Sequence, residues 1–215
     1  MAKNKFGKVT ATVAGLAILV LTLLANYIIA AENGQLKRNV ESANDRQMTN
    51  TDNKNLVIYF SRSGNTERMA MDIAKYYQAQ LVHLEAADYR PGFLGLVNAV
   101  KDSRSNRAEI TPETLDLSPY QTIFIGSPIW WYSPAPPAWQ FIHNNDFTDK
   151  NVVLFTTFNS SFKQQHIDEF QNQVEAKGGN FIKHIYVKRG RITQQINDET
   201  LSKKTRDKLD RLQLQ

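Results

Sequence analysis

A short apolar run followed by a loop of small polar residues constrains this chain more than any other feature. Residues 56–60, Leu-Val-Ile-Tyr-Phe, are typical of a strand buried on both faces of a parallel sheet. Residues 61–66, Ser-Arg-Ser-Gly-Asn-Thr, follow at once, and from Glu67 onward the apolar residues recur with the period of a helix. The sequence therefore predicts a strand, a tight loop and a helix.

The predicted loop has the chemistry of a phosphate-binding site. In a strand–loop–helix unit, the free backbone N–H groups of the first helical turn point toward the loop, and the helix dipole favours an anion there. Hydroxyl and amide side chains add donors, and Gly64 lets the backbone approach closely. The loop has neither the end of a P-loop nor a Gly-x-Gly-x-x-Gly pattern, which leaves a phosphomonoester as the ligand. An ordinary turn without a ligand is the alternative.

The N-terminal region predicts a membrane helix. Three lysines within residues 1–8 precede residues 9–31, which carry no charge and are long enough to cross a bilayer. By the positive-inside rule we expect a cytoplasmic tail (1–8), a single-pass transmembrane signal anchor in the cell membrane (9–31) and an extracytoplasmic remainder. The alternative is a signal peptide whose cleavage leaves a secreted protein. The polar residues 32–53 predict a flexible tether to a domain at residues 54–215.

Composition excludes several kinds of chemistry. The chain has no cysteine, which excludes disulfides, thiolate catalysis and thiolate-held iron–sulfur clusters. Most of the formal charge of +5 comes from the N-terminal region, and no basic run with interleaved aromatic residues is present, so we expect no nucleic-acid partner. The four histidines show no metal-binding spacing, so we expect no metal.

Strands and helices alternate along the rest of the chain, which predicts an α/β fold with a parallel sheet covered on both faces. Further strands are predicted at residues 81–85, 122–126, 151–156 and 181–187. One of the predicted helices, at residues 93–103, has Leu94, Val97 and Val100 as its apolar face, and the last helix spans residues 198–212.

Three adjacent aromatic residues lie in a proline-rich segment, residues 127–137, that we interpret as a loop after the third strand. Trp130, Trp131 and Tyr132 cannot all enter the core, so at least one must face outward, and a planar ligand would cover it. The alternatives are a loop folded back over the sheet edge or an oligomer contact.

The segment from Tyr59 to Thr66, Tyr-Phe-Ser-Arg-Ser-Gly-Asn-Thr, resembles the FMN-phosphate loop of flavodoxins. The resemblance extends over about residues 54–213. It implies a three-layer, doubly wound fold with a five-stranded parallel sheet in the order 2-1-3-4-5, following the transmembrane or signal helix, and FMN bound non-covalently. The implied FMN-binding residues are Ser61, Arg62, Ser63, Gly64, Asn65 and Thr66 at the phosphate, and Pro128, Ile129, Trp130, Trp131, Tyr132, Thr157, Phe158, Asn159 and Ser160 around the ring.

The position of these loops agrees with the resemblance. They follow the first, third and fourth strands, and the carboxyl ends of parallel strands lie at one edge of a sheet, where such folds bind ligands. We therefore expect a membrane-anchored FMN protein that performs electron transfer or oxidoreduction with a partner protein or a small quinone-like acceptor. No catalytic acid, base or nucleophile is discernible. A non-redox surface binding or sensing module is the alternative.

Two departures from the flavodoxin pattern limit the comparison. Tyr132, Ser133 and Pro134 stand where a glycine commonly adjoins the aromatic residue, so we expect two-electron chemistry to be favoured. The domain is also nearly neutral, whereas flavodoxins are strongly acidic, so we expect a different partner.

Overall fold

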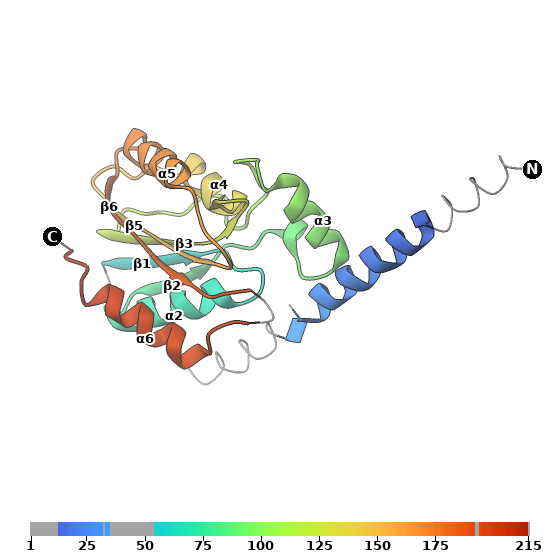
Figure 1. Ribbon diagram of the computed structural model, residues 1–215. Helices are drawn as coiled ribbons and strands as arrows, with labels where there is room; N and C mark the ends of the chain where they lie inside the picture. The colour runs from blue at the N-terminus through green and yellow to red at the C-terminus, as the bar shows by residue number, and fades with distance from the viewer. Residues whose placement is uncertain (1–12, 32, 35–53, 192–193, 215) are drawn as a thin grey trace, which may run out of the picture.

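The structure, a computed structural model, describes residues 13–31, 33–34, 54–191 and 194–214. A sheet lies at the centre of the domain with helices on both faces (Figure 1). Its strands are β1 (Asn55–Tyr59), β2 (Gln80–His83), β3 (Thr122–Trp130), β4 (Ser133–Pro134), β5 (Asn151–Phe158) and β6 (Asn180–Lys188). The five longer strands run parallel in the order β2-β1-β3-β5-β6, which confirms the predicted doubly wound α/β topology.

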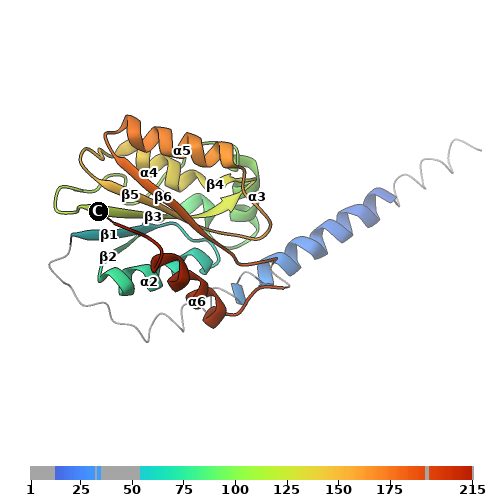
Figure 2. The ribbon, with the colours of Figure 1, turned by 60° about the vertical axis from the view of Figure 1, so that its left-hand side comes forward.

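The helices divide between the two faces (Figures 1 and 2). They are α2 (Asn65–Tyr77), the 3-10 turn η1 (Ala87–Tyr89), α3 (Phe93–Asp102), α4 (Pro136–Asn144), α5 (Gln164–Ala176) and α6 (Asp198–Leu209). One apolar core lies between the sheet and α2 and α6, with Met69, Ile73 and Leu201 fully buried. The other lies under α4 and α5, around Trp139 and Phe170, so the domain has the three predicted layers.

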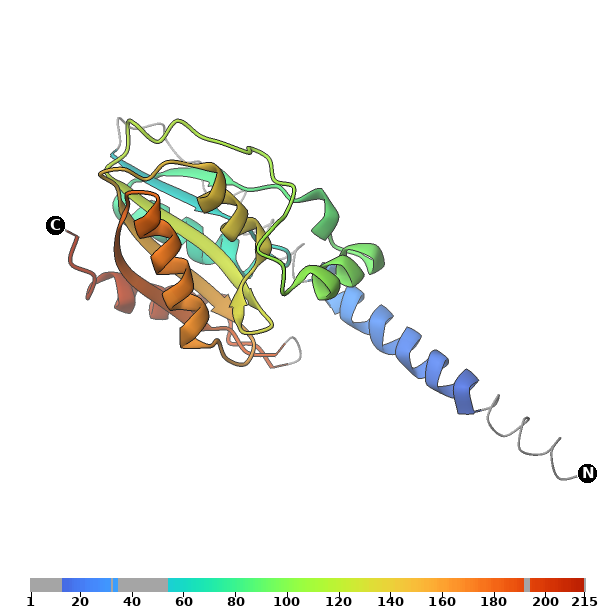
Figure 3. The same cartoon turned by 90° about the horizontal axis from the view of Figure 1, so that it is seen from above.

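The N-terminal helix occupies Val13–Ala31, has a mean hydropathy of 2.3 and packs against no core. It is long and apolar enough to cross a membrane, although a signal sequence would meet the same description. It projects away from the domain (Figure 3). Residues 9–12, the predicted tail at 1–8 and all of the predicted tether except residues 33–34 lie outside the described residues.

One expectation from the sequence is wrong. The third strand does not end at Gly126: it continues to Trp130, turns and pairs with β4, so the predicted proline-rich loop begins as a β-hairpin. Pro134 is compatible with a strand here because β4 pairs on one side only and is two residues long. The helix predicted at residues 93–103 is present as α3, and the residues of its apolar face, Leu94, Val97 and Val100, are exposed.

Candidate functional site

The carboxyl ends of three neighbouring strands bring the predicted loops together. β1 pairs with β3 and β3 pairs with β5, all in parallel, so the segments that follow Tyr59, Gly126 and Phe155 lie side by side at one edge of the sheet. They surround a cavity of about 100 Å³. The cavity is lined by Ser61, Arg62, Ser63, Asn65, Thr66, Pro128, Ile129, Trp130, Thr157, Phe158 and Asn159. All eleven were predicted site residues, whereas the predicted Gly64, Trp131, Tyr132 and Ser160 do not line it.

The first loop presents the start of α2 to this cavity. Gly64 is the residue that precedes the helix, and its φ of 82° lies in the left-handed region that favours glycine. No side chain caps the helix, so the backbone N–H groups of its first turn are not occupied by a cap. Together with the helix dipole, these donors favour a bound anion.

Two buried threonines join the first loop to the third. The hydroxyl oxygens of Thr66 and Thr157 lie 2.9 Å apart, and both side chains are almost entirely buried. A buried hydroxyl pair of this kind fixes the distance between the two loops, because losing either partner leaves a polar group unpaired. The cavity floor is therefore built jointly by β1 and β5.

Arg189, which the sequence analysis did not single out, contacts the first loop from the end of β6. Its Nε donates a hydrogen bond of 2.9 Å to Asn65 Oδ1, and its guanidinium also pairs with Asp198. Its Nη1 is buried and has no hydrogen-bond partner among the described residues. The signal was available, since Arg189 directly follows β6, whose carboxyl end lies at the same edge of the sheet.

The positive charge at the site is buried. Arg62 is only 7% exposed and donates a hydrogen bond of 3.2 Å to the carbonyl oxygen of Gly92, and Arg189 is 5% exposed. The carboxylate of Asp198 forms an ion pair with Arg189 and so neutralises part of this positive charge. Both arginines place positive charge near the start of α2, which adds to the attraction that the helix dipole exerts on an anion.

Titratable groups next to the loop keep one protonation state near neutral pH. Tyr59 donates a hydrogen bond of 3.0 Å to Glu67 Oε1, and burial raises the pKa of Tyr59 far above its ordinary value. Its ring stacks on His83, whose pKa is lowered by burial. Burial therefore favours the neutral form of both side chains at pH 7.

The aromatic hairpin turns one ring inward and two outward. Trp130 packs edge-on against Phe60 and Tyr89, with ring centroids 5.6 and 5.3 Å apart. Trp131 and Tyr132 are exposed, as expected for at least one of the three, and a cation lies over each ring: Arg104 at 5.3 Å and Lys163 at 5.5 Å. That set of rings at the cavity rim offers flat apolar surface to a ligand.

The turn of this hairpin is strained. Ser133 pairs with Trp130, which leaves Trp131 and Tyr132 as a two-residue connection, and both have positive φ angles of 46° and 73°. Asparagine and glycine normally fill such turns, and a bulky residue in this region costs on the order of 1 kcal/mol or more. Strain of this kind is commonly retained at binding sites.

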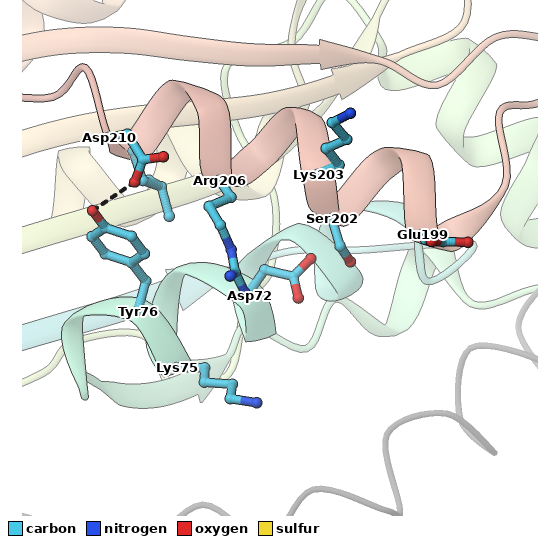
Figure 4. A pocket seen from close by; sticks show the side chains of 9 residues that line it. Asp72, Lys75, Tyr76, Glu199, Ser202, Lys203, Arg206 and Asp210 are labelled. Atoms are coloured by element: carbon cyan, nitrogen blue, oxygen red, sulfur yellow. Dashed lines mark hydrogen bonds between the residues drawn. The ribbon is translucent and has the colours of Figure 1, made fainter.

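A wider cleft lies elsewhere, between α2 and α6 (Figure 4). Its volume is about 600 Å³, and charges of both signs line it, with Tyr76 donating a hydrogen bond of 2.9 Å to Asp210. None of its residues belongs to the predicted loops. Among the described residues, no cluster of three or more histidine and carboxylate side chains can hold a metal ion.

Comparison with known proteins identifies the family. The family model described as Flavodoxin matches residues 54–198, which is more than half of the chain. A search of curated proteins gives no match.

Solved structures share the fold. One is described as a flavoprotein from Bacteroides uniformis (24% identity, TM-score 0.54, covering 70% of this chain and 96% of that one). Another is described as a flavoprotein from Bacteroides eggerthii (20% identity, TM-score 0.56, covering 75% of this chain and 99% of that one). A third is a flavoprotein from Lactobacillus acidophilus in complex with FMN (24% identity, TM-score 0.50, covering 62% of this chain and 93% of that one). The family match and the shared architecture lead to one conclusion: this chain belongs to the flavodoxin family.

Proposed function

We propose that this protein binds FMN non-covalently and uses it for electron transfer or oxidoreduction. The observation that carries the proposal is the convergence of three loops, held together by the bond between Thr66 and Thr157, on a cavity beside an uncapped helix start. Membership of the flavodoxin family and the FMN complex of the Lactobacillus acidophilus flavoprotein support it. FMN would supply the redox chemistry.

The residues present fit the phosphate of FMN. The loop from Ser61 to Thr66 would hold it with backbone N–H groups and hydroxyls, and Arg189 would hold Asn65 in place. The cavity has the size for a phosphate rather than a whole flavin, so the ring would lie across the rim formed by Trp130 to Tyr132 and by Thr157 to Ser160.

We further propose that the helix Val13–Ala31, as part of residues 9–31, anchors the protein in the cell membrane with the flavodoxin-like domain on the extracytoplasmic side. The exposure and hydropathy of the helix, together with the lysines before it, support this arrangement. The electron partner would be a second protein or a small quinone-like acceptor, because the exposed aromatic rim offers a flat apolar surface.

Titration of the purified full-length protein in detergent with FMN tests the proposal. We expect quenching of flavin fluorescence and a yellow protein after gel filtration. A colourless protein that leaves the flavin fluorescence unchanged would instead support a non-redox binding or sensing module. Extraction of cell membranes with alkaline carbonate tests the anchor separately, since an anchored protein stays in the pellet.

A further inference from the structure

Helix α3 presents its large apolar residues to solvent. Phe93, Leu94, Val97 and Val100 are 59%, 75%, 46% and 54% exposed. Their spacing places them on one side of the helix. The residues of α3 that are buried are the small ones, Gly95 and Ala99. A surface helix of a soluble domain normally has the opposite arrangement, with its large apolar residues toward the core.

A steric constraint sets this orientation. A β-carbon built on Gly95 would lie 1.9 Å from the carbonyl oxygen of Arg90, so only glycine allows α3 to approach the preceding segment this closely. Asp102, on the domain side of α3, accepts a hydrogen bond of 3.5 Å from the buried Tyr89 hydroxyl. These contacts keep the side of α3 that carries Gly95 and Ala99 against the domain, so the large apolar residues face solvent.

The C-terminal end of α3 lies close to the aromatic hairpin. Arg104, just beyond the helix, lies over the ring of Trp131, which is itself 53% exposed. We call the set Phe93, Leu94, Val97, Val100 and Trp131 the apolar platform. An exposed apolar surface of this extent marks an interaction site.

Charged residues surround the platform. Exposed cations of this segment are Arg90, Lys101, Arg104 and Arg107, and its carboxylates are Asp88, Asp102 and Glu109. The attraction to anionic lipid is therefore modest, and most of the affinity must come from apolar insertion. A helix with one apolar face, flanked by basic and aromatic side chains, suits the headgroup region of a bilayer.

We propose that the apolar platform docks on the bilayer in which the N-terminal helix is anchored, so that the rim of the flavin site faces lipid. This inference rests on the proposed function. Only residues 32–53 lie between the spanning helix and the domain, and a chain of that length can extend over at most about 75 Å. The platform is thus always within reach of a lipid surface.

The same features oppose a second copy of the chain as the occupant. In a two-fold interface a residue near the axis faces its own copy, so a platform centred on the axis would bring Lys101 and Arg104 close to the same cations of the partner. A bilayer imposes no such repulsion. Docking would also give the site a substrate source, because lipid-soluble quinone-like acceptors concentrate in the membrane.

Spin labelling of the full-length protein tests the docking directly. The chain has no cysteine, so Leu94→Cys introduces a single site for a nitroxide. The matched control is Asn172→Cys on α5, an exposed position on a helix that lies away from α3 (Figures 1 and 3). Both proteins are reconstituted into nanodiscs of phosphatidylcholine and phosphatidylglycerol, and collision of the label with oxygen and with a water-soluble nickel chelate is measured.

We expect the label at residue 94 to collide more with oxygen and less with nickel than the label at residue 172. Equal accessibility of the two labels would overturn the docking. Dipolar coupling between labels at residue 94 of two copies, together with free access of nickel to that label, would also overturn it. The flavin absorbance of each sample separates the two proposals. A yellow protein with a water-exposed label refutes docking alone, and a colourless protein with a lipid-exposed label refutes only the redox function.

A functional comparison adds a second readout. Leu94→Asp combined with Val97→Asp places negative charge on the platform without changing a buried residue. The control is Asn172→Asp, which places negative charge on the exposed side of α5. After reduction of the flavin with dithionite, we expect the double variant to reduce a bilayer-dissolved quinone several-fold more slowly and ferricyanide in water at an unchanged rate. Equal quinone rates in all three proteins would overturn the proposal.

Discussion

Thr66 and Thr157 lie 91 positions apart in the sequence, and their hydroxyl oxygens lie 2.9 Å apart in the structure. The bond connects α2, which follows β1, to the end of β5, across the intervening strand β3. Each threonine also lines the cavity. The strength of flavin binding should therefore depend on this pair.

Thr66→Ala should weaken FMN binding ten- to a hundredfold, because a hydrogen bond to a charged phosphate contributes about 1.5–3 kcal/mol. Thr66→Ser should recover most of the affinity. The control is Thr205→Ala in α6, which removes an equally buried hydroxyl that donates to the carbonyl oxygen of Leu201. Fluorescence titration measures all three, and equal affinities for Thr66→Ala and Thr205→Ala would refute the assignment.

Arg189→Gln should lower the affinity for FMN and leave the affinity for riboflavin nearly unchanged. The substitution removes the donor to Asn65 and the buried positive charge near the phosphate, and riboflavin has no phosphate. Arg211→Gln, at an exposed arginine after α6, is the control for the loss of net charge. An equal loss of FMN and riboflavin affinity would show that Arg189 acts only by holding the fold.

Replacing Trp131 by Asn together with Tyr132 by Gly should stabilise the protein without flavin and weaken flavin binding. The new pair is the sequence that two-residue turns with positive φ favour, so about 1 kcal/mol of strain is relieved. Urea unfolding of the flavin-free protein measures the gain. Trp131→Phe keeps a flat ring in the same turn and should show neither effect, so a gain in its stability would argue against strain as the cause.

Stability should fall as the pH drops below about 6.5, because of His184. Burial lowers the pKa of His184 to about 4, and Nε2 of its ring lies 2.8 Å from Thr156 Oγ1. The unfolded chain takes up the proton near pH 6.5, whereas the folded protein resists it down to about pH 4. On the order of 2–3 kcal/mol is therefore lost as the pH falls through that window.

His184→Gln should remove most of this pH dependence, since glutamine keeps a polar group beside Thr156 and does not titrate. His166→Gln, at a histidine bonded to Glu169 on the surface of α5, is the control. Urea unfolding between pH 4 and 7.5 measures both. A slope that survives in His184→Gln would point to other groups.

The sequence predicted the parts of the site that depend on local pattern. The run Leu56 to Phe60 and the loop to Thr66 carry their own signal, and parallel pairing then places the other two loops at the same edge. The position of Arg189 after β6 could be predicted, but its contacts with Asn65 and Asp198 could not, because no local pattern reveals them. The hairpin was missed because prolines normally weaken a strand prediction.

The exposure of the apolar face of α3 could not be predicted from the sequence, for a different reason. Periodicity shows which side of a helix is apolar, but not which side contacts the rest of the domain. Here the contact is decided by the close approach of Gly95 to Arg90, which the pattern of apolar residues does not record. Hydrophobicity alone would have placed Leu94 inside.

The missing side chain at Gly95 has a consequence for engineering this protein. Gly95→Ala would force α3 away from the backbone of Arg90 by about the width of a methyl group, although alanine is the better helix former. Substitutions chosen to raise helix propensity, or to make the outer residues of α3 more polar for solubility, would thus alter how the domain meets its surroundings. The absence of a side chain at residue 95 thus sets how α3, and with it the apolar platform, is oriented on the domain.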